Sequence, residues 1–226
     1  TLNRSSPTQI GSLTTWSQVA MGSAHVLALR TDGTLWCFGQ GNEGALGLGS
    51  TVDASSPTQI GSLTTWAAVG SGVAMSLAIK TDGTLWSWGK NNIGQLGQGD
   101  VINRSSPVQV GSLTDWSKIS SGIQHVVSIK TNGTLWSWGI GGAIGDGANV
   151  TKSSPIQIGS LTDWSTIDAG DNWTVAYKSD SSIWAWGFDN DVGDMAQGDQ
   201  GISRSSPIQI GSLTTWESAT AGKTTG

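Results

Sequence analysis

Two histidines are the side chains in this sequence best suited to acid–base or metal chemistry. His25 and His125 both follow a Gly-x-x phrase, and the chain has 2 histidines in all. An imidazole with a pKa near neutrality can serve as a general acid, a general base or a metal ligand. An active site would place a carboxylate or a nucleophile beside them, and no such residue recurs there. We therefore interpret both histidines as parts of a repeated framework.

An acidic segment, Asp189-Asn-Asp-Val-Gly-Asp194, has the oxygen-rich composition of a calcium site. The EF-hand loop carries Asp or Asn at its fifth position, glycine at its sixth and a bidentate glutamate at its twelfth. Here Gly193 precedes Asp194, and Gln200 stands at the twelfth position. Because the order is reversed and the glutamate is missing, we expect a solvated acidic loop and no metal site.

Covalent catalysis and phosphate binding lack the residues that they need. The sequence holds no Ser-His-Asp set, no Cys-His pair and no Gly-x-Ser-x-Gly elbow. The glycine-rich phrases Gly39-Gln-Gly41 and Gly139-Ile-Gly-Gly142 follow predicted strands but open no helix, which argues against a phosphate cradle. We predict that the protein is not an enzyme and that it has neither catalytic residues nor a cofactor.

The composition is that of a folded chain rich in turns. Its 226 residues include 33 glycines and 13 tryptophans, so the aromatic area available for burial is large and tight turns are frequent. The net charge is −5 and the 11 basic residues do not cluster, which argues against nucleic acid as a partner. The single cysteine, Cys37, excludes an intrachain disulfide. No apolar run is long enough to span a bilayer, and no signal peptide is recognisable.

One repeated phrase supplies the elements that would position any site. Leu77-Ala-Ile-Lys-Thr-Asp-Gly-Thr-Leu-Trp-Ser-Trp-Gly89 reads as two short apolar strands joined by a tight turn, and it recurs at 27–39, 127–139 and 175–187. Two further markers keep the same period: a tryptophan, and the proline of a Ser-Ser-Pro-x-Gln-(Ile/Val)-Gly phrase. They are Trp16, Trp66, Trp116, Trp164 and Trp216, and Pro7, Pro57, Pro107, Pro155 and Pro207.

Each repeat has room for four strands. The first begins at the marker tryptophan and ends in small residues, the second and third form the hairpin, and the fourth runs through the proline phrase. Proline is tolerated in an outer strand because it has no N–H to donate to a neighbour. No segment of helical length has a 3.6-residue apolar period. We predict an all-β fold, a β-propeller of four-stranded antiparallel blades between which large and small residues interlock.

The sequence also predicts the turn of each hairpin. Three copies carry Asp-Gly or Asn-Gly, at 32–33, 82–83 and 132–133, which is a strong signal for a two-residue loop. The fourth, Asp180-Ser-Ser182, lacks the glycine, so we expect a wider or less favourable turn. A basic residue precedes every turn, and we expect these residues at solvated hairpin ends rather than in a cationic ring for a partner. They are Arg30, Lys80, Lys130 and Lys178.

These phrases resemble the repeats of the regulator of chromosome condensation family. Its pattern runs from Gly-x-x-His through an apolar strand and Asp-Gly to Trp-x-Trp-Gly and Asn-x-x-Gly-Gln-Leu-Gly. The second repeat here supplies Trp86-Ser-Trp-Gly89 and Asn91-Asn-Ile-Gly-Gln-Leu-Gly97, and the first supplies Asn42-Glu-Gly-Ala-Leu-Gly47. The resemblance covers essentially the whole chain and implies a propeller, usually of seven blades. Met75 and Trp173 stand where the pattern has histidine.

We expect one repeat domain over residues 1–226. It would comprise an outer strand within 1–15, four whole blades and a partial blade at 216–226; the whole blades are expected at about 16–61, 66–111, 116–159 and 164–211. Closing a ring through the two ends would need the second and third strands of the partial blade, which are missing. We therefore expect a seven-bladed or otherwise larger ring, completed by further blades of a longer parent chain or by neighbouring chains.

Positions at which the copies differ are the candidates for binding. The phrase Gly-Ser-Leu-Thr-(Thr/Asp)-Trp is nearly invariant, whereas the residues after the first strand and the loops before the fourth strand vary. Loops on a rigid scaffold commonly carry binding. Trp173 is the one tryptophan outside the repeat register, which makes it the first candidate for a contact, although it could equally fill the space that Met75 fills. The candidate binding face is Trp173, Asn172, Asp171, Met75, Gln124, His125 and His25.

We interpret the sequence as a non-enzymatic propeller that presents loops to a protein or a cell-surface macromolecule. Its near-identical, Ser/Thr/Gly-rich repeats are similar to the bacterial and phage members of the family. That likeness implies a structural or adhesive module of a phage fibre, virion or bacterial surface, with an extracellular or virion location and no membrane insertion. Two alternatives stay open: a secreted inhibitor similar to the propeller-type β-lactamase inhibitor, and guanine-nucleotide exchange with chromatin binding, as in the family's namesake.

Overall fold

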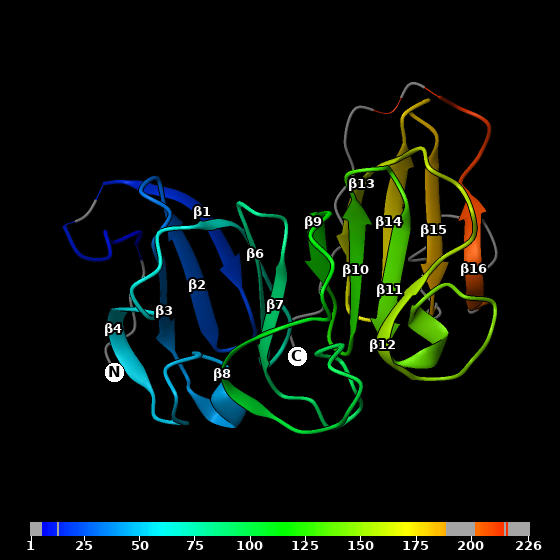
Figure 1. Cartoon of the computed structure of the whole chain (residues 1–226). Helices are drawn as coiled ribbons and strands as arrows, with labels where there is room; N and C mark the ends of the chain where they lie inside the picture. The colour runs from blue at the N-terminus through cyan, green and yellow to red at the C-terminus, as the bar shows by residue number, and fades with distance from the viewer. Residues whose placement is uncertain (1–5, 13, 189–201, 215, 217–226) are drawn as a thin grey trace.

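Four antiparallel sheets make up the part of the chain that the computed structural model describes, residues 6–12, 14–188, 202–214 and 216 (Figure 1). Blade 1 contains β1 (Trp16–Met21), β2 (His25–Arg30), β3 (Leu35–Gly39) and β4 (Ala54–Gln59). Blade 2 contains β5 (Trp66–Ser71), β6 (Met75–Lys80), β7 (Leu85–Gly89) and β8 (Arg104–Gln109). Blade 3 contains β9 (Trp116–Ser121), β10 (His125–Lys130), β11 (Leu135–Gly139) and β12 (Lys152–Gln157). Blade 4 contains β13 (Trp164–Ala169), β14 (Trp173–Lys178), β15 (Ile183–Gly187) and β16 (Arg204–Gln209).

Within each blade the strands pair in sequence order. The two middle strands keep one register throughout: Leu27 pairs with Cys37, Leu77 with Ser87, Val127 with Ser137, and Val175 with Ala185. The proline phrase forms the last strand of the sheet in every blade, where its missing N–H is tolerated. The predicted four-stranded blades of an all-β propeller are confirmed.

The apolar core lies between blades rather than within one sheet. At the first junction, side chains of blades 1 and 2 bury one another to 5% exposure or less; they include Leu27, Leu35 and Leu46 with Trp66, Val69 and Trp88. The next two junctions repeat this arrangement. Burying one such side chain is worth about 1.5–3 kcal/mol, so adjacent blades stabilise each other. The blades follow one another in an arc, with the first and the last at its two ends (Figure 1).

Glycine in each loop before the fourth strand makes room for a tryptophan of the next blade. Gly47 has a φ of +70°, and a Cβ at this position would lie 2.7 Å from Nε1 of Trp88. Gly97 lies against Trp138 in the same way. The interlocking of large and small residues between blades thus depends on glycine for both backbone angle and space.

The hairpin turns are alike in all four blades, including the one without glycine. Gly33 has a φ of +76°, and its N–H donates to the carbonyl of Arg30. In blade 4, Ser181 takes the same place with a φ of +62° and donates to the carbonyl of Lys178. The turn is therefore not wider than the other three, although a wider turn was one of the two expectations. It is less favourable, because a residue with a Cβ occupies the left-handed region.

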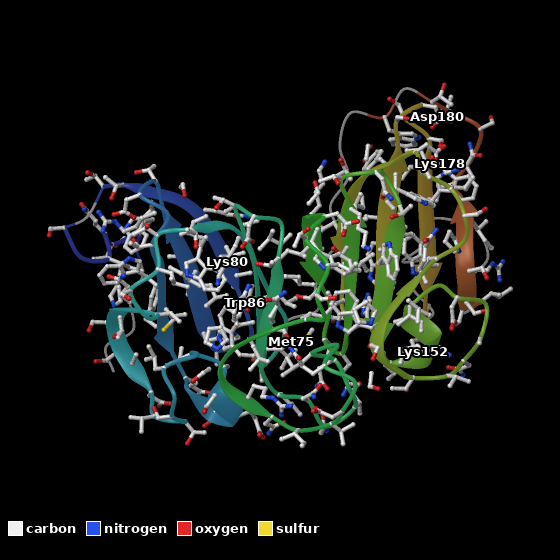
Figure 2. All side chains as sticks on the ribbon, in the orientation of Figure 1. Met75, Lys80, Trp86, Lys152, Lys178 and Asp180 are labelled. Atoms are coloured by element: carbon white, nitrogen blue, oxygen red, sulfur yellow. The ribbon has the colours of Figure 1, made fainter. Side chains whose placement is uncertain are left out.

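The basic residues before the turns do not form the solvated hairpin ends that we expected. Lys80 Nζ lies 3.6 Å from the ring centroid of Trp86, and Figure 2 shows the two side chains together. Lys130 lies 4.1 Å from the ring centroid of Trp136, and only 5% of its side chain is exposed. A cation over an indole face is attracted by the ring quadrupole, so these residues are part of the framework.

One face of blade 1 is covered by no other blade among the described residues. It carries a groove of about 390 Å³ lined chiefly by apolar side chains, among them Trp16, Val19, Met21, Val26 and Phe38. The equivalent faces of the other blades are covered at the junctions. Residues 6–12, from the predicted outer strand, line part of this groove at Thr8, Gln9 and Ile10 and form no strand.

Several predictions lie outside the described residues. They are the acidic segment at 189–194, the first five residues of the outer strand predicted within 1–15, and the part of the partial blade beyond Trp216. The limits of the single domain and the size of the complete ring stay predictions. Among the described residues, no helix has the length and apolar character needed to cross a bilayer.

Candidate functional site

The variable segments gather on one face of the blades. The turn after each first strand lies beside the loop that follows each third strand: Gln40 N donates to Ala24 O at 2.8 Å, and Ile140 N to Gln124 O at 2.9 Å. We call these turns (22–24, 72–74, 122–124 and 170–172) and loops (40–53, 90–103 and 140–151) the loop face. Its short helices, η1 (Asn42–Gly44) and η2 (Gly141–Ala143), lie at the lower edge of Figure 1.

The opposite face, here the hairpin face, carries the Asp-Gly turns and the Gly-Ser-Leu-Thr connectors between blades. The two elements are tied together, since Trp66 N donates to Gly33 O at 3.2 Å. Asp180, in the last hairpin, marks this face at the upper edge of Figure 2. The invariant phrases thus lie opposite the variable ones.

His25 joins blade 1 to blade 2. Its Nε2 lies 2.9 Å from Ser71 Oγ and 3.0 Å from Ser76 Oγ, and Ser76 in turn donates to Ala45 O at 2.8 Å. The ring is 3% exposed, and burial lowers its pKa from 6.5 to about 4, although the backbone bond at Met75 works in the other direction. The imidazole is therefore neutral at pH 7 and serves as an interblade hydrogen-bonding group.

The same position in the next two blades is also a junction residue. His125 Nε2 lies 3.0 Å from Thr174 Oγ1 of blade 4, and its ring is fully buried. Met75, labelled in Figure 2, is 1% exposed and packs in the core between blades 2 and 3. Both histidines thus bond through Nε2 to hydroxyl groups of the following blade.

The seven candidate residues of the binding face divide by exposure. His25, Met75, His125 and Asp171 are buried, so they shape the turns and do not reach a partner in this structure. Gln124, Asn172 and Trp173 are partly exposed on the loop face. Trp173 stands at the register of Met75 and packs against Val175, Tyr177 and Ile183 at the far end of the arc. Partner binding by the exposed residues stays a prediction.

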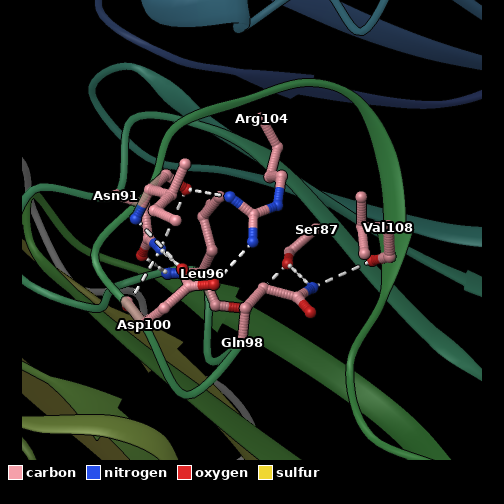
Figure 3. A network of polar contacts seen from close by, with 8 residues as sticks. Ser87, Asn91, Leu96, Gln98, Asp100, Arg104 and Val108 are labelled. Carbon is pink, nitrogen blue, oxygen red and sulfur yellow. Dashed lines mark hydrogen bonds and ion pairs between the residues drawn. The ribbon is translucent and has the colours of Figure 1, made fainter.

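A hydrogen-bond network holds the β7–β8 loop in blade 2 (Figure 3). The fully buried Asn91 donates to Asp100 O and Ile102 O, and it accepts from Leu96 N at 2.9 Å. Arg104 closes the network with an ion pair of 2.6 Å to Asp100. A loop whose backbone groups are satisfied in this way is ordered rather than adaptable.

Sequence reasoning missed one position inside the variable loops. Counting back five residues from each marker proline gives an aliphatic residue in every copy. In the described blades these residues are 70%, 61%, 57% and 45% exposed, and we call them the aliphatic row: Val52, Ile102, Val150 and Ile202. The signal was present in the sequence, but it appears only when the loops are aligned on the proline that follows them.

The described residues offer little reactive chemistry. They contain no group of three or more His, Cys, Asp or Glu side chains arranged to hold a metal ion. Cys37 is buried, and burial raises the pKa of its thiol to about 12, which keeps it protonated and unreactive. The hydroxyl groups that bond to the two imidazoles, those of Ser71, Ser76 and Thr174, are buried at the blade junctions, and the exposed surface is what the arrangement can present to a partner.

Family comparison agrees with the repeats. The family models described as "Regulator of chromosome condensation (RCC1) repeat" match residues 32–79 and 82–129 in one case and residues 16–45 in the other. No curated protein matches this chain.

Comparison with solved structures places the fold among propellers of the same type. Human WBSCR16 superposes with a TM-score of 0.78 at 25% identity, covering 87% of this chain and 53% of its own. Prp20p from Saccharomyces cerevisiae, described with its binding properties to Gsp1p and histones, superposes with a TM-score of 0.80 at 22% identity. The match covers 92% of this chain and 54% of Prp20p. Yeast RCC1 (Prp20) bound to Kap60 superposes with a TM-score of 0.76 at 20% identity, and the match covers 91% of this chain and 52% of the yeast protein. The chain spans about half the length of these three structures.

Proposed function

The chain belongs to the regulator of chromosome condensation (RCC1) repeat family, and from this premise we propose that it is a non-catalytic module that binds another protein through its loop face. Propellers of this family are protein-interaction modules. The partner of this chain would contact the exposed members of the variable turns, chiefly Gln124, Asn172 and Trp173.

The observation that carries the proposal is the segregation of constant and variable residues. The residues that form junctions and hairpins recur from blade to blade, and the differing residues lie together on the loop face. Each variable turn is closed by the same backbone bond, for example Gly122 N to His125 O at 3.0 Å. Such turns can change in sequence without loss of the fold, which is the arrangement expected of a recognition surface.

The relatives support a protein as the partner class. Prp20p is described with binding to Gsp1p and histones, and yeast RCC1 with bound Kap60. These individual partners are not carried over, because the likeness is at 22% and 20% identity and extends over about half of each relative.

A structural or adhesive role outside the cell or in a virion is the finer form of the proposal. It is supported by the near-identical Ser/Thr/Gly-rich repeats, which suit a rigid scaffold made of equivalent units. A secreted inhibitor and a nucleotide-exchange factor would use the same loop face, so they differ from this proposal in the partner and not in the surface.

Two matched variants test the proposal. Ile123→Lys/Gln124→Lys changes the partly exposed turn of blade 3, whereas Ser62→Lys/Ser112→Lys adds the same charge to exposed connectors on the hairpin face. Proteins from a native extract are captured on the immobilised chain and identified, and their affinity for each variant is then measured by titration with the purified partner. We expect at least about tenfold weaker binding for the loop-face variant, because a charge is placed at a desolvated contact.

The control variant should bind as the parent chain does. Equal affinity for the loop-face variant, or a loss confined to the hairpin-face variant, would overturn the proposed surface. Turnover of any substrate by the parent chain would contradict the non-catalytic assignment.

A further inference from the structure

Asn132 and Gly133 lie at the tip of the β10–β11 hairpin, and they are the one Asn-Gly pair in the sequence. The asparagine is exposed to solvent and the glycine is partly exposed. Blades 1 and 2 carry Asp-Gly at the same register, at 32–33 and 82–83. Blade 3 therefore has a side-chain amide where these two blades have a carboxylate.

An Asn-Gly pair can lose its side-chain amide without an enzyme. The backbone nitrogen of Gly133 gives its proton to solvent base and attacks Cγ of Asn132. The N–Cγ bond forms, the Cγ–Nδ2 bond breaks, and the amide group leaves with a proton as ammonia. Water then opens the five-membered imide at one of its two carbonyls, which gives aspartate or isoaspartate. Glycine favours the attack because it has no side chain to hinder it.

The folded turn opposes this reaction at both reacting groups. Gly133 N donates to the carbonyl of Lys130 at 2.9 Å, so the proton that must leave is engaged in a hydrogen bond. Oδ1 of Asn132 accepts from the backbone N of Thr134 at 3.1 Å and from its hydroxyl at 2.7 Å, which fixes the side-chain amide. The attack therefore requires the turn to open, and the free-energy cost of opening lowers the rate.

The turn is anchored in the framework of blades 3 and 4. Thr134 is 6% exposed, and its hydroxyl also accepts from Nε1 of Trp136 at 2.9 Å. The carbonyl of Gly133 accepts from Trp164 N at 3.2 Å, and a Cβ on this glycine would lie 2.0 Å from Thr162 O. Because the connector to blade 4 packs so closely on the glycine, the turn opens only when that connector loosens.

Aspartate at this position fits the turn. In blade 2, Asp82 Oδ1 accepts from Thr84 N at 3.0 Å and from Thr84 Oγ1 at 2.6 Å, the two bonds that Asn132 makes in blade 3. A carboxylate accepts such bonds more strongly than a neutral amide does. The aspartate product can therefore re-form the hairpin.

Blade 4 already has the charges that this product would create in blade 3. Asp180 stands in its turn, and Lys178 pairs with Asp163 at 3.6 Å. In blade 3, Lys130 pairs with Asp115 at 3.2 Å, so a carboxylate at position 132 completes the same set. The second carboxylate beside the lysine is thus accommodated by this fold.

Isoaspartate does not fit the turn. It adds one carbon to the backbone between residues 132 and 133, inside a loop that joins the paired residues Ile129 and Leu135. A longer loop shifts the register of the two strands, which the buried faces of the blade oppose.

We propose that Asn132 is a site of spontaneous deamidation that the folded turn slows, and that the aspartate product takes the hairpin form of blades 1 and 2. The inference goes beyond the proposed function, because the change adds a negative charge to the hairpin face. Binding through the loop face does not depend on it, so failure of either proposal leaves the other standing.

Mass spectrometry of proteolytic peptides measures the conversion of Asn132 when the full chain is incubated at mildly alkaline pH. The folded chain should convert at least about tenfold more slowly than the same chain unfolded in guanidinium chloride, because the turn must first open. Equal rates in the two states, or no conversion in the unfolded chain, would overturn the proposal.

Variants of Thr134 test the lock itself. Thr134→Ala removes the hydroxyl bond to Oδ1 and should raise the rate in the folded chain by about fivefold, whereas Thr134→Ser keeps the hydroxyl and should convert as the parent does. Thr84→Ala is the matched control, since it makes the same change in blade 2 and should leave the rate at Asn132 unaltered. Equal acceleration by Thr134→Ala and Thr84→Ala would contradict a local lock. If near-UV circular dichroism shows that Thr134→Ala is unfolded, the comparison of the folded and unfolded parent chain decides.

Asn132→Asp supplies the product directly. Its midpoint of unfolding in guanidinium chloride should equal or exceed that of the parent chain, because the carboxylate keeps both bonds to Thr134. A lower midpoint would show that aspartate does not fit this turn and would overturn that part of the proposal.

Discussion

The indole of Trp88, in the third strand of blade 2, donates from Nε1 to the carbonyl of Ala45, in the loop of blade 1, at 2.9 Å. Trp138 repeats the contact one blade further on, with Gln95 O at 3.0 Å. Each bond ties a loop of the loop face to the core of the following blade. The loops are therefore part of the junctions that stabilise the propeller as well as its exposed surface.

Trp88→Phe should lower the free energy of unfolding by about 1–2 kcal/mol, because it removes a buried hydrogen bond and some packing. Phenylalanine is the residue that blade 1 carries at this register, as Phe38. Urea unfolding followed by far-UV circular dichroism measures the change. Trp216→Phe is the control, because Trp216 is 40% exposed, and equal midpoints for the two variants would refute the stabilising role of the bond.

Gly47→Ala should destabilise the fold more than Gly61→Ala does. Both glycines have positive φ values, +70° and +62°, so both substitutions carry similar backbone strain. Only at Gly47 would the new Cβ meet another group, Trp88 Nε1 at 2.7 Å, whereas nothing lies within 4 Å at Gly61. We expect the extra loss to exceed about 1 kcal/mol in denaturant titrations, as overpacking usually does. Equal losses would mean that the Trp88 contact is not tight.

The buried His25 should make stability depend on pH. Its pKa is about 4 in the folded chain and near 6.5 when unfolded, so the unfolded state binds the proton first as the pH falls. Stability is full above pH 6.5 and declines down to about pH 4. Between pH 7 and pH 5 the loss from this group should be about 2 kcal/mol.

His25→Met is the matched variant for this dependence, because Met75 occupies the same register in blade 2. Its unfolding free energy should change less between pH 7 and pH 5 than that of the parent chain. An unchanged pH dependence in the variant would show that another group causes it.

Substitutions at Lys130 and Asp115 distinguish the stability contributed by the cation–π contact from that contributed by the ion pair. Lys130→Met removes both the contact with the ring of Trp136 at 4.1 Å and the pair with Asp115 at 3.2 Å. It should lower stability by about 1–2 kcal/mol, since the lysine is desolvated. Asp115→Thr copies blade 2, where Thr65 stands at this place, and should cost less than about 1 kcal/mol because the carboxylate is 39% exposed. A larger loss for Asp115→Thr, measured by thermal unfolding, would assign the stability to the ion pair.

The fold could be predicted because the residue pattern within each repeat determines the register of its strands. The alternation in Leu85-Trp-Ser-Trp-Gly89 sets which side chains face each neighbouring blade, and the proline phrase identifies the outer strand. The environment of Lys130 could not be predicted in this way. Its partner rings, Trp116 and Trp136, come from other strands, and only their packing creates the desolvated place for a cation.

The site was predictable in part. The sequence identified the variable turns, but it could not tell which of their residues are exposed: Met75 and His125 are covered by the following blade, and Gln124 is not. The aliphatic row escaped notice because the loops differ in sequence and in length. Its members share exposure rather than a motif, and exposure is decided by the fold.

The central claim is that framework and recognition surface are separate in this propeller, and one variant tests it most directly. Val73→Ser/Ile123→Ser/Gln124→Ala gives the turns of blades 2 and 3 the sequence that blade 1 has at Ser23 and Ala24. We predict that its unfolding free energy stays within about 0.5 kcal/mol of the parent value, as for surface positions, while binding of the captured partner protein is lost. Unfolding of the variant, or binding at the parent affinity, would contradict the claim.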